Sequence, residues 1–290
     1  MALDSALALI ESVRDQRVLF VGDTIIDEYH YVTPLGKSPK ENIIPVFANG
    51  KEIFQGGVEA ASKHVASFCA SVGISGAGRV TRKVRFVDMV YLRKMFEVHF
   101  VEGEELKQVL NLDGVNTVVV TDFGHGAITP FTIEGLCSAP IFLAVNAQTN
   151  SANIGFNLVT KYPRADYIVI DEGEARLAAA DRESDLRIVM DKLATGRCQK
   201  LIVTRGVHGA IGRSPEGNFS HVEAITTRVV DTLGAGDAFF AVTAPMAKTG
   251  SIEDLLLIGN AAGALKTQII GHRESVTKEK LIAYMKEHCK

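Results

Sequence analysis

The sequence predicts an α/β fold in three layers, with helices on both faces of a mostly parallel central sheet and a small β-sheet lid beside it. Two patterns predict the layers. Continuous apolar runs, which are typical of strands buried on both faces, recur at residues 17–23, 117–121, 141–145, 167–170 and 201–204. Helix-like segments lie between several of them, at residues 104–112, 152–162, 174–180 and 185–194. This alternation favours parallel strands joined by helices.

A different residue pattern in two segments predicts the lid. Residues 28–54 hold short β-like pieces separated by prolines and a glycine, without an evident helix. Residues 83–88 and 96–102 alternate apolar and polar side chains, the pattern of strands with one face in water. We therefore expect a single domain over residues 1–290, with lid strands from about 28–54 and 83–102.

Composition is that of an ordinary globular protein. The 290 residues are 47% hydrophobic and 22% charged, with a net charge of −3 and no basic excess that would favour nucleic acid. The first ten residues include Asp4 and predict an amphipathic helix rather than a signal peptide. No apolar run approaches the roughly 18 residues of a membrane span. The four cysteines form no close pair, so we expect reduced thiols in a cytoplasmic protein.

The most informative stretch is residues 231–239, which read Asp-Thr-Leu-Gly-Ala-Gly-Asp-Ala-Phe after a β-like run at 221–230. Gly234, Ala235 and Gly236 have almost no side chain and lie where a predicted strand turns into a helix. A helix start offers unpaired N–H groups and a partial positive charge. The stretch therefore predicts an anion site that a phosphate can approach closely.

Asp237 lies beside this site, just before the helix-like run 238–248. Its carboxylate and a bound anion would repel each other, which costs energy. A role in the chemistry would account for this cost, for example if the acid accepts a proton from a hydroxyl that attacks the phosphate. The alternative is that Asp237 merely caps the helix, and a bare Gly-x-Gly turn would favour that alternative. The longer pattern favours the chemical role.

That longer pattern, Asp-Thr-x-Gly-Ala-Gly-Asp-x-Phe, resembles the C-terminal signature of the ribokinase family of carbohydrate kinases, also called the PfkB family. The resemblance implies a ribokinase-like fold and a phosphotransferase that uses ATP and Mg²⁺. It also implies that Asp237 is the catalytic base, that Gly234 to Gly236 stabilise the transferred phosphoryl group, and that Thr232 contacts the nucleotide.

Two acids, Asp23 and Asp27, follow the first predicted strand. At a strand's carboxyl end they could accept hydrogen bonds from sugar hydroxyls, or form only a turn and an exposed charge. The resemblance favours the first possibility, since an Asp at the place of Asp27 binds the acceptor sugar in the family.

The acceptor region resembles one branch of the family in particular. Residues 27–31 and 37–46 are similar to the opening and the lid strand of bacterial heptose 7-phosphate kinases. Residues 81–85 resemble their Lys-x-Arg strand, which makes Lys83 and Arg85 candidates for binding a substrate phosphate. The alternative is that these basic residues form a solvated strand face.

Two features depart from the family pattern. Gly56 and Gly57 resemble the glycines that approach the sugar, but Ala60 stands where the family has a sugar-binding Asn. A helix N-terminus without a ligand would also explain the two glycines. Only seven residues separate Gly73 from Thr81, where relatives carry a further strand, turn and helix. Either the sheet has lost an edge unit or the acceptor pocket is more open.

The nucleotide end begins after the predicted strand 167–170, where Asp171 and Glu174 follow. The family has Asn-x-x-Glu there, with the Glu ordering water around Mg²⁺, and carboxylates suit a cation held largely through water. Alternatively, the acids simply favour the first turn of the next helix.

Two further segments resemble nucleotide-binding parts of the family. Residues 201–210 are similar to the segment beside the ATP phosphates, which implies contacts from Thr204, Gly206 and Gly209. Asn260, on the helix predicted over 252–270, would border the adenine. The family resemblance also implies a homodimer that pairs through the lid.

The sequence therefore predicts an ATP- and Mg²⁺-dependent kinase acting on a sugar or sugar phosphate. Heptose 7-phosphate, destined for bacterial lipopolysaccharide, is the foremost acceptor, while ribose, fructose phosphates and nucleosides remain open. A second class is a kinase-fold protein that binds a sugar or nucleotide with little or no turnover. Ala60 and the missing segment favour this class, and the intact Asp237 disfavours it. A dehydrogenase is excluded because no G-x-G-x-x-G follows the first strand.

Overall fold

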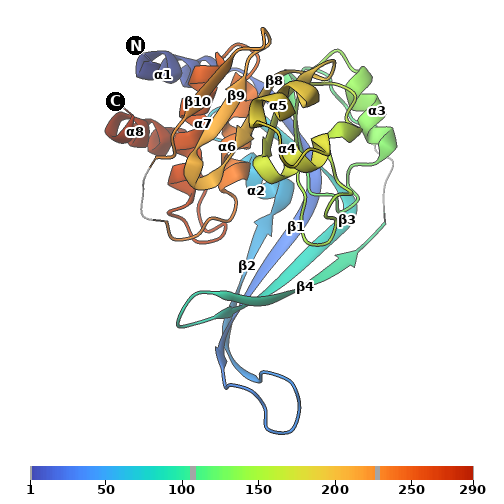
Figure 1. Ribbon diagram of the computed structural model, residues 1–290, viewed down its shortest axis with the longest axis vertical. Helices are drawn as coiled ribbons and strands as arrows, with labels where there is room; N and C mark the ends of the chain where they lie inside the picture. Colours follow the sequence, from blue (N-terminus) through green and yellow to red (C-terminus); the bar gives the residue numbers. More distant parts are fainter. Residues whose placement is uncertain (1, 105–108, 226–228, 290) are drawn as a thin grey trace.

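A single sheet runs through the protein, as the computed structural model shows for residues 2–104, 109–225 and 229–289 (Figure 1). Its strand order is β10-β9-β8-β7-β6-β5-β1-β3-β4, with β2 paired to β1. The bounds are β1 Arg17–Pro34, β2 Val46–Gly56, β3 Ser71–Asp88, β4 Lys94–Glu102, β5 Thr117–Asp122, β6 Phe142–Ala147, β7 Ala165–Asp171, β8 Cys198–Thr204, β9 Ala210–Arg213 and β10 Phe219–Val222.

Helices cover both faces of the sheet. They are α1 Ala2–Ser12, α2 Gly57–Lys63, α3 Pro130–Ser138, α4 Glu172–Ala179, α5 Leu186–Ala194, α6 Ala235–Thr243, α7 Ile252–Lys266 and α8 Lys278–His288, with short 3₁₀ turns η1 Val159–Lys161, η2 Gly206–His208 and η3 Ala244–Met246. One core cluster gathers α1, α2, α6, α7 and α8, and the other gathers α3, α4 and α5. Among the described residues, no helix has the length and apolar character needed to cross a bilayer.

The central strands are buried on both faces, as the apolar runs predicted. In β5, Val119 packs into the first core while Val118 and Val120 pack into the second. Strands β3, β1, β5, β6, β7 and β8 run parallel to one another in that order, and β9 and β10 add an antiparallel edge. The expected three-layer arrangement around a mostly parallel sheet is confirmed.

Two long strands carry the sheet beyond its helical layers. The far halves of β1 and β3 project from the core together with β2 and β4, which pair with them antiparallel (Figure 1). We call this projection the lid: residues 25–34, 46–56, 80–88 and 94–102. Its outer surface exposes large apolar side chains, among them Phe47, Ile53, Phe96 and Phe100.

Strand β3 also explains the short segment after Gly73. It runs unbroken from Ser71 to Asp88 and pairs in parallel with β1 along its length, with one irregularity between Gly22 and Thr24. No helix or turn interrupts this part of the described chain. The sheet therefore continues directly into the lid, which fits the first of the two alternatives, a sheet that has lost an edge unit.

One predicted helix is replaced by turns, and another falls partly outside the described residues. The range 152–162 forms turns that end in η1, because Gly155 has a φ of +79° and nearby asparagines hydrogen-bond to backbone groups. Within the range 104–112, residues 104 and 109–112 are neither helix nor strand, and 105–108 lie outside the described residues.

The C-terminal elements are shorter than the sequence predicted. Strand β10 ends at Val222, so the predicted strand 221–230 does not run to the Gly-rich turn, and residues 226–228 lie outside the described part. Helix α6 ends at Thr243 and tightens into η3 around Pro245, whose ring cannot continue a regular helix. Helix α7 ends at Lys266, four residues before the predicted end at 270.

Candidate active site

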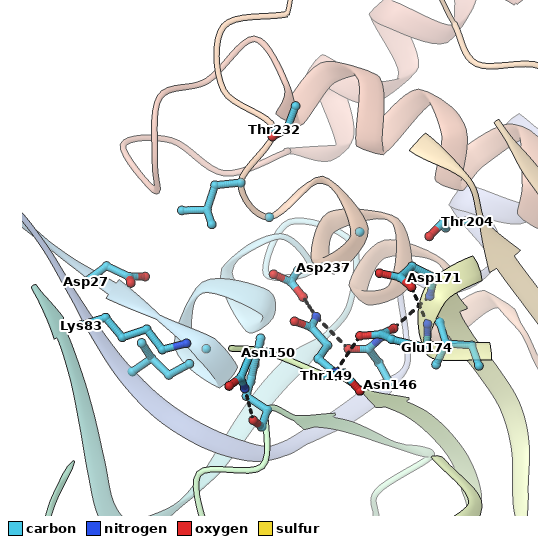
Figure 2. A pocket seen from close by; sticks show the side chains of 18 of the residues that line it. Asp27, Lys83, Asn146, Thr149, Asn150, Asp171, Glu174, Thr204, Thr232 and Asp237 are labelled. Carbon is cyan, nitrogen blue, oxygen red and sulfur yellow. Dashed lines mark hydrogen bonds between the residues drawn. The ribbon is translucent and has the colours of Figure 1, made fainter. Parts of the chain in front are cut away.

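A cavity of about 390 Å³ lies at the carboxyl ends of the parallel strands, where ligands gather in open α/β sheets. Figure 2 shows Asp27 and Lys83 at one end, Asp171, Glu174 and Thr204 at the other, and Asp237 between them. The lining residues are Ile25, Asp27, Gly57, Lys83, Arg85, Lys94, Phe123, Asn146, Gln148, Thr149, Asn150, Val169, Ile170, Asp171, Glu174, Thr204, Thr232, Leu233, Gly234, Gly236, Asp237 and His272. Sequence segments from both halves of the chain thus meet in one site.

The Gly-rich turn forms the middle of this cavity. Gly234 adopts a left-handed conformation, with φ +75°, and precedes the first residue of α6. N–H groups in the first turn of a helix have no partner within the helix, so they are available to an anion. Gly234, Gly236 and Asp237 all line the cavity. The turn can therefore receive a phosphoryl group next to a carboxylate.

Asp237 receives a hydrogen bond from Gln148, a residue that the sequence did not single out. The Gln148 side-chain amide also donates to Asn146 Oδ1 at 3.0 Å. Burial raises the pKa of Asp237, while the hydrogen bond from Gln148 and the nearby charges of His272 and Lys266 oppose that rise. Gln148 thus orients the candidate base and favours its ionised form.

Asparagine side chains hold the loop that carries Gln148 in place through hydrogen bonds to backbone carbonyl groups. The Asn157 side-chain amide donates to the carbonyl oxygen of Asp122 at 2.9 Å and to that of Gln148 at 3.0 Å. Asn150 and Asn153 both donate to the carbonyl oxygen of Phe123, at 2.7 and 2.9 Å. Residues 148–157 are therefore tied to the loop that follows β5.

Asp27 stands at the acceptor end, but it is not free. Its carboxylate pairs with Arg85 and lies 3.3 Å from His272 Nε2. Burial alone would raise the pKa of Asp27, yet the hydrogen bonds and charges of His272 and Arg85 lower it to about 2. His272, on the loop after α7, is a second lining residue that the sequence analysis missed.

Lys83 brings a positive charge into the cavity, where the charges of Asp27, Glu97 and Asp23 favour its ionised form without a direct ion pair. The residue is only 8% exposed, and among the described residues no carboxylate lies within ion-pair distance of its ammonium. Burial lowers the pKa of Lys83, and the neighbouring Arg85 lowers it further. A buried cation without a direct ion-pair partner favours an anionic ligand at this end.

Asp23 occupies a different place from the one predicted. Its carboxylate accepts hydrogen bonds from the backbone N–H groups of Phe123 at 2.8 Å and Ala127 at 2.9 Å, and it does not line the cavity. Burial, with the neighbouring Asp122, raises the pKa of Asp23 to about 6. The geometry gives Asp23 the task of holding the loop after β5 rather than that of binding an acceptor.

The two glycines of the predicted sugar motif allow close packing against β1. A side chain at Gly56 would collide with the Asp27 carboxylate, and one at Gly57 would collide with the carbonyl oxygen of Asp23. Ala60 is buried, and Glu59 accepts a hydrogen bond from Thr24 Oγ1 at 2.9 Å without lining the cavity. Glu59 therefore does not replace the missing Asn.

The acids after β7 form a helix cap that faces the cavity. Asp171 and Glu174 make a capping box at the start of α4, and Glu174 also accepts from the backbone N–H of Thr149 at 2.8 Å. Burial, together with the charges of Asp171 and Asp237, raises the pKa of Glu174 to about 7.

These carboxylates fit a hydrated magnesium ion. Asp171 and Glu174 both line the cavity, and the negative charge of Asp171 contributes to the raised pKa of Glu174. Within the described ranges, no three His, Cys, Asp or Glu side chains converge into a direct metal cage. Mg²⁺ usually keeps several waters and needs only one or two carboxylates, so this donor set suits it.

The remaining predicted nucleotide residues divide into two groups. Thr204 and Thr232 line the cavity. Gly206 and Gly209, which shape η2, and Asn260, which donates to the carbonyl oxygen of Glu223 at 2.7 Å, lie outside the lining. For these three residues nucleotide contact stays a prediction.

Known proteins share this architecture. The structure of a ribokinase from Thermotoga maritima superposes on this chain with a TM-score of 0.74 and 16% sequence identity. The match covers 94% of this chain and 99% of the ribokinase chain. A ribokinase from Arabidopsis thaliana, solved with ribose and ATP, matches with a TM-score of 0.69 and 15% identity. This match also covers 94% of this chain and 99% of the ribokinase chain. The fold is ribokinase-like.

The sequence supports the same relationship. Residues 157–279 match the model of the pfkB family carbohydrate kinases. The bifunctional protein HldE of Bradyrhizobium diazoefficiens is 24% identical over 308 aligned positions, which cover 91% of this chain and 62% of that protein. The chain thus spans about three fifths of the length of this relative.

Proposed function

We propose that the protein is a kinase that transfers the γ-phosphate of ATP to a hydroxyl group of a sugar or sugar phosphate. The observation that carries this proposal is the position of Asp237, a half-buried carboxylate beside the anion-binding turn, in the middle of a cavity that extends from Asp27 to Thr204. The PfkB family match over residues 157–279 supports it. The ribokinase that contains ribose and ATP supports ATP as the donor.

The chemistry follows from the order of groups along the cavity. An acceptor held near Asp27 presents its hydroxyl to Asp237, which takes the proton as the oxygen attacks the γ-phosphorus and the bond to the leaving ADP oxygen breaks. Backbone N–H groups of the Gly234 to Gly236 turn receive the negative charge of the transferred group. Asp171 and Glu174 would hold Mg²⁺ through water, and the ion supplies charge neutralisation at the phosphates.

The acceptor end favours a phosphorylated sugar. Lys83, Arg85, Lys94 and His272 line it, whereas carboxylates line the nucleotide end. A positive end suits an acceptor that already carries a phosphate. With the resemblance of residues 27–31 and 37–46 to heptose 7-phosphate kinases and the similarity to HldE, we propose heptose 7-phosphate as the acceptor. A role in bacterial lipopolysaccharide synthesis would follow.

The setting of the enzyme completes the proposal. All four cysteines are free thiols, which fits the reducing cytoplasm where ATP is available. The apolar side chains on the lid suit a homodimer in which two lids pair.

A binding protein with little turnover is the second candidate. One observation favours it: Asp27, the expected acceptor ligand, is already paired with Arg85 and His272. Acceptor binding would then have to share or displace these partners.

Release of ADP in the presence of Mg²⁺, measured against heptose 7-phosphate, fructose phosphates, ribose and nucleosides, tests the proposal. We expect turnover on a phosphorylated sugar. The Lys83→Met variant should raise the KM for that sugar but not for ATP, because its charge lies at the acceptor end. Arg82→Met is the matched control, since Arg82 pairs with Glu28 on the lid outside the cavity. ATP binding without turnover on any acceptor would favour the binding protein.

A further inference from the structure

A buried lysine lies directly behind the anion-binding turn. Lys266, the last residue of α7, is 0% exposed. Its ammonium donates to the carbonyl oxygens of Gly271 at 2.7 Å and Leu233 at 2.9 Å, with a longer contact to Ile269 at 3.4 Å. A lysine has three N–H donors only when it is charged, so this arrangement uses the full capacity of an ammonium ion.

Asp231 completes the arrangement from the other side. Its carboxylate accepts from the backbone N–H groups of Leu233 at 3.0 Å and Gly271 at 2.9 Å, the two residues whose carbonyl oxygens contact Lys266. Leu233 and Gly271 are therefore each held at both their N–H and their C=O groups. One acid and one base together tie the turn before α6 to the loop after α7.

The charge is close to the reacting centre. A Cβ atom at Gly234 would lie 3.5 Å from Cε of Lys266, so the lysine packs beneath the residue that begins the anion-binding turn. Burial lowers the pKa of Lys266, while the carboxylates of Asp231 and Asp237 oppose this effect. The lysine thus contributes positive charge to both acids of the signature, together with Lys94 at Asp231 and His272 at Asp237.

Converging carbonyl oxygens repel one another unless a cation lies among them. Carbonyl groups arranged in this way replace the hydration shell of K⁺ in channel filters. We propose that the Lys266 ammonium is a built-in monovalent cation that preforms the anion-binding turn, so that the enzyme needs no dissolved K⁺ or NH₄⁺. The catalytic part of this inference rests on the proposed kinase function, whereas the structural part does not.

Lys266→Met tests the inference, because methionine keeps the apolar stem and removes only the ammonium head. In buffers that contain only tetramethylammonium, we expect kcat to fall about 100-fold as the turn loses its geometry. Added K⁺ or NH₄⁺ should enter the vacated cage and restore a large part of kcat. The wild type should show the same kcat in all these salts at equal ionic strength.

Lys200→Met is the matched control. The Lys200 ammonium also donates to two carbonyl oxygens, those of Ala247 and Gly250 at 2.7 and 2.6 Å, but it lies away from the cavity. This variant should lose stability yet keep the wild-type kcat. Severalfold activation of the wild type by K⁺ would overturn the inference, as would a Lys266→Met variant with unchanged kcat or with a loss that no small cation relieves.

The melting temperature gives a second readout that does not depend on turnover. For Lys266→Met it should rise with K⁺ or NH₄⁺ and not with tetramethylammonium, while the wild type should not respond. If no acceptor is phosphorylated by the wild type but this pattern holds, the kinase proposal fails and the built-in cation stands. If both proteins respond equally to K⁺, the built-in cation is refuted. If Lys266→Met does not fold, the salt dependence of wild-type kcat decides.

Discussion

At the scale of single residues, the chemistry depends on how Asp237 is held. Burial raises the pKa of its carboxyl group and so favours the protonated form. A protonated carboxyl group cannot act as a base, so other groups must favour the carboxylate. The hydrogen bond from Gln148 and the charge of Lys266 oppose protonation from two sides. The site thus combines a half-buried carboxylate, whose electrostatic interactions are stronger than in water, with donors that favour its ionised form.

Gln148→Leu should therefore change the pH dependence of turnover. Loss of the donated hydrogen bond raises the pKa of Asp237, so the acid limb of kcat should move up by about one pH unit. Turnover should recover largely at high pH, because the ionised base is then restored. The pH–rate profile measures both effects.

Gln199→Leu serves as the control for this prediction. Gln199 also donates to a carboxylate, Asp166 Oδ1 at 3.4 Å, but outside the cavity, and its loss should leave the profile in place. A Gln148→Leu variant that is slower by the same factor at every pH would contradict the assigned role.

At the scale of elements, the loop after β6 is the part that the sequence described least well. Its apolar spacing resembled a helix, but Asn150, Asn153 and Asn157 bind backbone groups of neighbouring segments instead. Such contacts depend on partners that are distant along the chain. Gln148 and Asp237, for example, are 89 residues apart. No local pattern could have predicted that pair.

Asn157→Ala should weaken this part of the protein. The variant loses side-chain hydrogen bonds to Asp122 and Gln148 in a buried place, so we expect the free energy of unfolding to fall by about 2–3 kcal/mol. Urea denaturation measures the change. Asn111→Ala, which removes an exposed bond to the N–H of Asp113, should cost less than about 1 kcal/mol. If the free energy of unfolding fell equally in the two variants, the hydrogen bonds of Asn157 would not stabilise this loop in the way described.

Other elements were predictable because their signals are local. Strands buried on both faces need continuous apolar runs, as in β5 and β8, and Gly234 marks the turn before α6 because its φ of +75° favours glycine. The ends of α6 and α7 were less predictable. Pro245 tightens the first, and the cage around Lys266 accompanies the end of the second.

At the scale of the whole molecule, the lid is the feature that a single chain leaves incompletely covered. Its exposed apolar residues, such as Phe47 and Phe96, lie on strands that project far from the core (Figure 1). Isolated ribbons of this kind bury little apolar surface by themselves. A partner lid would cover them.

The dimer can be tested by sedimentation velocity. The wild type should sediment as a dimer, and Phe47→Glu should shift it to a monomer because a charge would be buried in the interface. Phe131→Glu alters a comparably exposed phenylalanine on α3, away from the lid, and should leave the dimer intact. A monomeric wild type would refute pairing through the lid.

The most direct test of the central claim is turnover of Asp237→Asn, measured as ADP release with the acceptor that the wild type phosphorylates. We expect kcat to fall by about 10²–10⁴-fold while ATP still binds, because the amide cannot accept the hydroxyl proton. Asp254→Asn alters a partly exposed acid in the first turn of α7, away from the cavity, and should keep wild-type turnover. Near-normal turnover of Asp237→Asn would contradict its role as the catalytic base.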